Sequence, residues 1–218
     1  GRELIKQCEK EDISVIGIDI VDRNNTNYEY HKVDICSSEL AEIISEDIDA
    51  VIHLAALSKD SDCRDKAYEC FNINVMGTLN LINSVRAKKI KQFIFASSEW
   101  VYDDFKNNEE KDENSLINIF NHKSEYALSK LVSESNLRQQ HFHDDLDITI
   151  LRFGIIYGPR KNGWSAVEEI SNKIKNEKEI VVGSLKTGRR FIHVNDIARG
   201  IILSLGLTGL HTINLTGD

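Results

Sequence analysis

The feature that most constrains this fold is a regular alternation of short apolar runs with stretches of helical periodicity. The runs that read as strands are residues 13–19, 28–35, 50–54, 93–96 and 147–153. The helical patterns cover residues 1–10, 37–46, 64–88 and a stretch opening at Ser124. Strands alternating with helices are typical of a parallel sheet with helices on both faces. We therefore predict an α/β fold with a doubly wound parallel sheet.

Small and polar residues follow several of these strands. In an open parallel sheet, ligands bind at the carboxyl ends of the strands. We therefore expect a ligand site among Asp19, Ala55, Ala56, Ser97, Ser98, Phe153 and Gly154.

Tyr126 and Lys130 lie four residues apart in the helical stretch, so both face one side of that helix. An ammonium beside a phenol favours the phenolate, and we expect Lys130 to lower the pKa of Tyr126. Three other tyrosines have the same spacing to a lysine, but they lie in an extended segment, a loop and a turn before Pro159. With Ser98 at a strand end, the pair outlines a proton-transfer site.

Composition narrows the class of protein. The 218 residues suit one domain with a small second lobe, and the net charge of −8 disfavours nucleic acid and anionic membranes as partners. We find no apolar stretch of about 20 residues and no signal peptide, so we expect a cytoplasmic protein without a membrane span. Cys8, Cys36, Cys63 and Cys70 are widely spaced and read as reduced thiols, with no metal site.

Two residues near the start of the chain suggest a dinucleotide. Asp19 ends the first strand, where a carboxylate accepts hydrogen bonds from an adenine-ribose diol and favours NAD over NADP. Gly1 opens a helix 18 positions earlier, which suits the last glycine of a phosphate-binding turn whose strand and earlier glycines are missing. The alternatives are a solvated carboxylate at Asp19 and an arbitrary start at Gly1.

Three further features have plain structural interpretations. The acidic segment 103–115 predicts a mobile loop, with a lid over the site as the alternative. His141 and His143, beside two aspartates, fall in a connection and favour a solvated turn over a metal site. His53 closes a buried strand and favours a hydrogen-bonded structural histidine over a catalytic one.

Seven segments in order resemble the extended short-chain dehydrogenase/reductase family, specifically its NAD-dependent nucleotide-sugar epimerase/dehydratase branch. They are residues 51–56 (VIHLAA), 74–80 (NVMGTLN), 97–102 (SSEWVY), 126–130 (YALSK), 151–159 (LRFGIIYGP), 189–198 (RRFIHVNDIA) and 209–217.

The resemblance implies catalytic and binding roles. Tyr126 would be the acid/base, Lys130 would bind the nicotinamide ribose, and Ser98 would be the catalytic hydroxyl. Ser98, Glu99 and Arg189 would contact the substrate, with Arg189 on its diphosphate. Asp196 would cap a helix over 197–205. The remaining cofactor positions would be Asp34 and Ile35 at adenine, Leu54, Ala55, Ala56 and Asn74 near the pyrophosphate, and Ala96, Ser97 and Phe153 near nicotinamide.

Three departures from the family pattern stand out. The glycine-rich turn is missing apart from Gly1, Ile155 replaces an asparagine, and the chain stops at Asp218, where family members continue. The dehydratase subgroup places Asp-Glu after its catalytic threonine, where this chain has Glu99 and Trp100. Because Trp100 cannot supply a carboxylate, dehydration is disfavoured.

The resulting prediction is an NAD-dependent epimerase that oxidises a nucleotide-sugar transiently to a keto-sugar and reduces it again. The alternatives are a dehydrogenase, reductase or dehydratase of the same family, or a non-catalytic NAD-binding relative. Residues 1–160 would form the NAD-binding domain and 161–218 a partial substrate lobe, with helix 196–206 returning to the first domain. The family also implies a homodimer.

Overall fold

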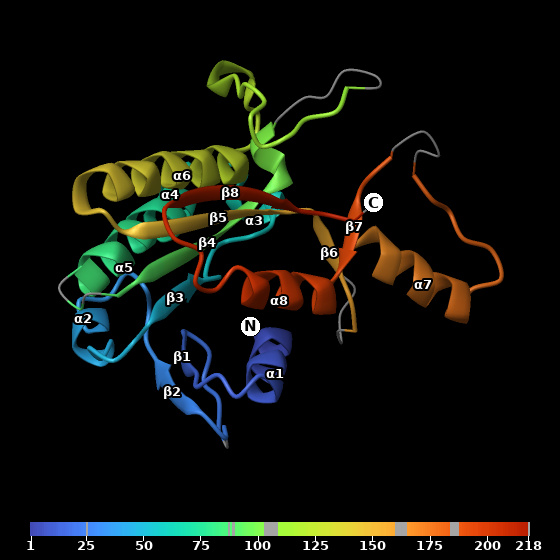
Figure 1. Cartoon of the computed structure of the whole chain (residues 1–218). Coiled ribbons are helices and arrows are strands. Elements are labelled where there is room, and N and C mark those ends of the chain that lie inside the picture. Colours follow the sequence, from blue (N-terminus) through green and yellow to red (C-terminus); the bar gives the residue numbers. More distant parts are fainter. Residues whose placement is uncertain are drawn as a thin grey trace.

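A four-stranded parallel sheet forms the centre of the molecule, in the order β3-β4-β5-β8 (Figure 1). The computed structural model describes residues 1–24, 26–86, 88, 90–102, 109–159, 165–183 and 188–217. The four strands span Ala50–His53, Gln92–Ser98, Asp147–Phe153 and Leu210–Leu215. All neighbours in this sheet run parallel, which confirms the predicted α/β fold class.

Strand β4 is buried along its whole length because both faces of the sheet are covered. Successive strand side chains point to opposite faces. Phe93 and Phe95 accordingly belong to one core cluster, whereas Ile94 belongs to a second. The continuous apolar run that predicted this strand reflects burial on both sides.

Helices cover each face of the sheet (Figure 1). The first cluster packs under α2 (Leu40–Ile43), α5 (Gly77–Arg86) and α6 (Glu125–Asp144). The second packs against α1 (Arg2–Lys10) and α8 (Val194–Leu203). Helix α6 starts where the sequence predicts, because the Ser124 hydroxyl accepts a hydrogen bond from the Ala127 N–H and caps it. It runs through His141 and His143, so these residues form its last turn rather than a connection.

Several elements differ from the sequence prediction. The predicted helix over 64–88 consists of α4 (Ala67–Phe71), a π-helical turn (Asn72–Met76) and α5, and α3 (Asp60–Cys63) precedes them. Strands β1 (Ile16–Asp19) and β2 (Glu29–Lys32) form a parallel pair that is separate from the central sheet. A third parallel pair joins β6 (Ile155–Tyr157) to β7 (Phe191–His193).

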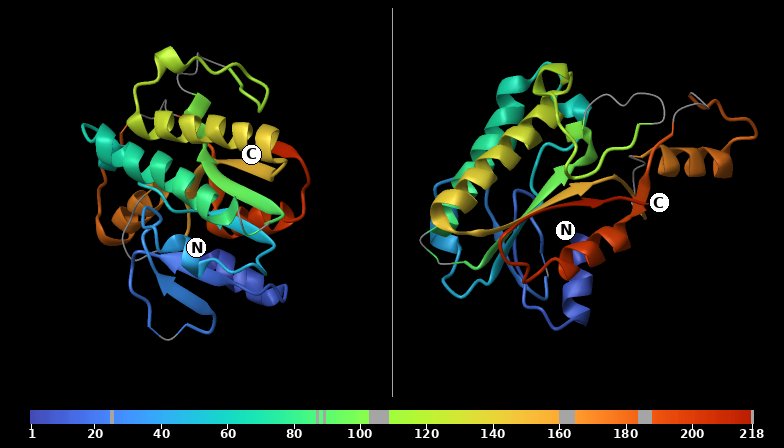
Figure 2. Two further views of the ribbon diagram at one scale, coloured as in Figure 1. Left: turned by 90° about the vertical axis from the view of Figure 1, so that its left-hand side faces the viewer. Right: turned by 45° about the horizontal axis from the view of Figure 1, so that its top comes forward.

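The C-terminal part of the chain returns to the sheet more fully than predicted. Strand β8 pairs with β5, although the predicted boundary at residue 160 assigns it to the substrate lobe. Helix α8 begins at Val194, and the His193 side chain caps it by accepting from the Asn195 N–H. Asp196 therefore lies inside the first turn and is not the cap that we predicted. Helix α7 (Ala166–Asn176) projects from the body of the molecule (Figure 2).

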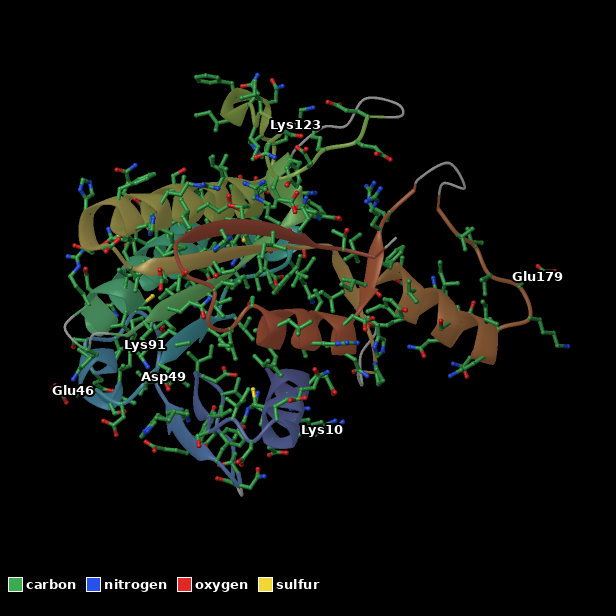
Figure 3. All side chains as sticks on the ribbon, in the orientation of Figure 1. Lys10, Glu46, Asp49, Lys91, Lys123 and Glu179 are labelled. Carbon is green, nitrogen blue, oxygen red and sulfur yellow. The ribbon has the colours of Figure 1, made fainter. Side chains whose placement is uncertain are left out.

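The two ends of the sheet differ in character. At the end where β3 and β4 begin, Asp49 and Lys91 form an exposed ion pair at 2.5 Å (Figure 3). Short 3-10 helices, Glu99–Tyr102 and Ile119–Asn121, lie in the connection that follows the other end of β4.

Within the described residues, no helix is both long and apolar enough to cross a membrane.

Candidate active site

A cavity of about 830 Å³ lies at the carboxyl ends of β3, β4 and β5. Its volume is in the range of pockets that hold small molecules and cofactors. The first turn of α1, the first turns of α6 and one side of α8 also line it. Ten of the predicted site residues line this cavity: Gly1, Leu54, Ala56, Ala96, Ser97, Ser98, Glu99, Tyr126, Lys130 and Phe153.

Ser98 and Tyr126 face each other in the cavity. The Ser98 hydroxyl lies near enough to the Tyr126 phenol to favour its phenolate. The Ser98 hydroxyl also accepts a hydrogen bond from the backbone N–H of Trp100 at 3.3 Å. The Trp100 ring meets the Tyr126 ring edge-on, with centroids 6.5 Å apart. The phenol is thus held between a strand end and an aromatic wall.

Lys130 is buried one turn further along α6, and its Nζ donates to the Ala96 carbonyl at 2.8 Å. The ammonium lies 4.7 Å from the centroid of the Phe95 ring and 6.0 Å from that of Tyr126. Burial is the main cause that lowers its pKa, to about 8. Lys130 therefore remains largely protonated at neutral pH.

The expected effect of Lys130 on Tyr126 is not found, and that prediction was wrong for the protein without ligands. Burial raises the pKa of Tyr126 to about 12, and the neighbouring Ser98 hydroxyl offsets only part of this rise. The reason is geometric, because the ammonium is bonded to Ala96 rather than to the phenol. The sequence correctly places both residues on one helix face but does not show where the ammonium points.

Six predicted site residues are absent from the described lining of the cavity. Asp19, at the end of β1, pairs with Arg23 at 3.4 Å. Asp34 accepts a hydrogen bond from the Cys36 N–H in a turn, and Arg189 is exposed. The other three are Ile35, Ala55 and Asn74.

Asn74 supports the cavity wall from behind. Its buried amide accepts from the Leu57 N–H at 2.8 Å and donates to the Leu57 carbonyl at 3.0 Å. It also donates to the Ser129 hydroxyl on α6 at 2.9 Å. Asn74 lies in the π-helical turn, a distortion that is frequent at functional sites. The loop after β3 is thereby tied to the helix that carries Tyr126.

Glu99 lies directly after Ser98 and lines the same cavity. Burial is the main cause that raises the pKa of its carboxyl group, while the charges of Arg189 and Arg190 lower it. The exposed Arg189 thus influences the site through its charge. A carboxyl group that keeps its proton more readily than usual is a potential proton donor.

The structure shows the contacts of the two histidines, His53 and His141, and of part of the acidic segment 103–115. His53 is buried and shares a hydrogen bond with Thr78 at 2.9 Å, and His141 bonds the Leu146 carbonyl. Residues 103–108 of the acidic segment lie outside the described residues. In the described half, the Glu113 carboxylate accepts from the Asn214 N–H at 2.7 Å.

The sequence analysis missed several residues around the site. Ser58, Lys59, Asp60, Ser61 and Trp100 line the cavity, and no recognised pattern pointed to the first four. It also missed the buried pair of Glu134 and Arg152, joined at 2.7 Å behind the site. The spacing of Glu134, four residues after Lys130, was an available signal for its position on the same helix face.

Comparison with known proteins identifies relatives of this chain. The chain is 30% identical over 195 residues to the dTDP-D-glucose 4,6-dehydratase of Dictyostelium discoideum, covering 84% of this chain and 45% of that protein. It is 29% identical over 198 residues to the UDP-glucuronate 4-epimerase of Thermodesulfobacterium geofontis (strain OPF15), covering 89% and 60% respectively. The chain thus spans about half the length of these two relatives.

The fold matches that of solved epimerases. The crystal structure of UDP-glucose 4-epimerase from Thermotoga maritima with UDP-glucose has a TM-score of 0.89 and 21% identity, covering 99% of this chain and 73% of that one. Residues 1–215 match the model of the NAD dependent epimerase/dehydratase family. This chain therefore belongs to the NAD dependent epimerase/dehydratase family.

Proposed function

We propose that this chain carries the catalytic part of an NAD-dependent epimerase that acts on a nucleotide-sugar. The observation that carries the proposal is the grouping of Ser98, Tyr126 and Lys130 on one cavity. Residues 1–160 would form the NAD-binding domain, together with α8 and β8 from the later part of the chain. The rest of 161–218 would contribute to a substrate lobe.

The residues of the cavity fit a dinucleotide. Its walls combine small residues, Ala56 and Ala96, with the apolar side chains of Leu54 and Phe153. The N-terminus of α1 at Gly1 also lines it, and a helix N-terminus attracts phosphate. Asp19, at the end of β1, remains the proposed partner of the adenine-ribose diol. When bound, NAD would supply hydride acceptance and return.

In the proposed mechanism, Tyr126 removes a proton from a sugar hydroxyl while Ser98 orients that hydroxyl. Lys130 supplies a buried positive charge and would hold the nicotinamide ribose. The phenol of the ligand-free protein keeps its proton at neutral pH, since its pKa is about 12. Added positive charge beside the ring would favour the phenolate. Asp34, Ile35, Ala55, Asn74 and Ser97 remain proposed cofactor positions, directly or as supports.

A dehydratase is the second candidate, and Glu99 is the observation that favours it. Its partly buried carboxyl group, with a raised pKa, lies beside Ser98 where it would protonate a departing hydroxyl. Trp100 in place of a second carboxylate favours the epimerase. Mass spectrometry of the product distinguishes the two, because dehydration removes the mass of one water and epimerisation leaves the mass unchanged.

The test is Tyr126→Phe in the purified protein, assayed with a panel of nucleotide-sugars and NAD. We expect turnover to fall by at least about 10³-fold, in line with the loss of a general acid/base, with NAD affinity largely spared. Tyr68→Phe, on the exposed face of α4, is the control. A near-wild-type rate for Tyr126→Phe would remove Tyr126 from the mechanism.

The same assay separates the remaining alternatives. Net accumulation of reduced cofactor from NAD would indicate a dehydrogenase, and net consumption of NADH, supplied in place of NAD, would indicate a reductase. NAD binding without turnover of any sugar by the wild-type protein would indicate a non-catalytic relative. A homodimer and a cytoplasmic location remain predictions, and sedimentation velocity would measure the former.

A further inference from the structure

Glu134 and Arg152 form a buried ion pair behind the candidate site, outside the steps proposed above. Their side chains are only 2% and 4% exposed. Arg152 binds the carboxylate through two nitrogens, Nη2 to Oε2 at 2.7 Å and Nε to Oε1 at 3.0 Å. Desolvation offsets much of the attraction in such a pair, so it is weak evidence for a stabilising role. The other contacts of this ion pair indicate a role in positioning the strand ends.

The pair reaches the tips of both central strands. Glu134 accepts a third hydrogen bond, from the Ser97 hydroxyl at 2.5 Å. Ser97 is the residue directly before Ser98, and its register partner on β5 is Arg152 itself. One carboxylate on α6 therefore binds side chains from two adjacent strands just below the catalytic hydroxyl.

Three successive turns of α6 face three successive residues of β4. Tyr126, Lys130 and Glu134 follow at intervals of four and share one helix face. Tyr126 lies near the Ser98 hydroxyl, Lys130 donates to the Ala96 carbonyl, and Glu134 accepts from the Ser97 hydroxyl. These contacts set the position of the strand tip relative to the helix.

We propose that Glu134 is a positioning residue for this site, holding the tip of β4 so that Ser98 meets Tyr126 and placing a negative charge that acts on Lys130. The effect on turnover rests on the proposed function. The effect on Lys130 does not, because it is a property of the protein without substrate.

The charged surroundings of Lys130 make the second effect measurable. Burial lowers the Lys130 pKa, and Cys70, Glu134 and Cys63 raise it, in that order. Several titratable groups act on Lys130 in the part of the chain that the structure describes. Glu134 is the one carboxylate among them. Burial lowers the pKa of His53 to about 3, so its ring is neutral, and burial raises the pKa of the Cys63 thiol. The other groups are Cys70 on α4, Tyr126 on α6 and Arg152 on β5.

The test follows the titration of Lys130 by NMR of protein labelled at lysine Cε, with the resonance assigned from its absence in Lys130→Met. We expect Glu134→Gln to lower the titration midpoint by about one pH unit, because a nearby opposite charge is lost. The basic limb of the pH profile of kcat/KM should shift with it. Asp144→Asn, which removes an exposed carboxylate from the far end of α6, should leave the midpoint unchanged.

Glu134→Asp separates position from charge and keeps the test decisive if Glu134→Gln fails to fold. The shorter side chain retains the charge but not the reach to Ser97, so the Lys130 midpoint should stay and kcat should fall at least about tenfold. An unshifted midpoint in Glu134→Gln, or a wild-type rate in Glu134→Asp, would overturn the proposal. If the wild-type protein turns over no nucleotide-sugar, the proposed function fails, and the Lys130 titration still decides this inference.

Discussion

The ammonium of Lys130 donates to the backbone carbonyl of Ala96 at 2.8 Å, at the point where β4 meets α6. The cation is thereby held in a buried position, 4.7 Å from the centre of the Phe95 ring. Its position explains why burial, rather than the neighbouring lysine, dominates the pKa of Tyr126. It also makes the stability of the protein depend on pH in a defined direction.

The first prediction concerns that pH dependence. The pKa of Lys130 is lowered from 10.5 to about 8 on folding, so between these values the unfolded chain binds a proton that the folded chain does not. Stability therefore rises with pH in this window. Relative to Lys130→Met, the wild-type protein should gain about 2–3 kcal/mol between pH 8 and pH 10, because a tenfold change in a proton-binding constant corresponds to about 1.4 kcal/mol. Urea unfolding at both pH values measures it.

The control for this comparison is Lys10→Met, at the exposed end of α1. Its difference from the wild-type protein should not change between the two pH values. A constant difference for Lys130→Met would contradict the depressed pKa.

A second prediction concerns Ser98. Ser98→Ala removes the hydroxyl that favours the Tyr126 phenolate, so we expect kcat to fall by about 10²–10³-fold, as for other lost hydrogen-bond donors in active sites. The phenol should titrate at still higher pH, which ultraviolet difference spectra would show. Ser135→Ala removes a hydroxyl that bonds only within α6, to the Leu131 carbonyl, and should retain the wild-type rate. Equal rates for the two variants would argue against the assignment of Ser98.

A third prediction concerns His53 and acid. Burial lowers the pKa of His53 from 6.5 to about 3, so the unfolded chain takes up a proton that the folded chain resists. Stability should therefore be lost as the pH falls below 6.5, by about 3 kcal/mol at pH 4. His53→Gln should lack this part of the acid sensitivity in urea unfolding. His143→Gln, on the exposed last turn of α6, should behave as the wild-type protein.

A fourth prediction concerns Asn74. Asn74→Ala leaves the N–H and carbonyl of Leu57 without their side-chain partner, which should cost about 2–4 kcal/mol of unfolding free energy. Asn72→Ala, two positions earlier in the same π-helical turn but exposed, is the matched control and should cost less than about 1 kcal/mol. Similar losses in both variants would show that the turn itself, rather than the amide, matters.

The sequence by itself determined those features that depend on local pattern. The run at residues 93–96 predicted β4, Ser124 predicted the start of α6, and the spacing of Tyr126 and Lys130 placed both on one helix face. Periodicity and capping act over a few residues, so a single segment contains the information. The seven family segments, found in the correct order, also indicated the overall fold.

Only the tertiary structure decided which way buried polar groups point and what they bind. Lys130 bonds a carbonyl 34 residues away, and Glu134 binds Ser97 and Arg152 at separations of 37 and 18 residues. Asn74 reaches Leu57 and Ser129 from a π-helical turn, and β8 rejoins the sheet beside β5. These contacts depend on desolvation and on partners from distant elements. Both are fixed only when the helices pack on the sheet.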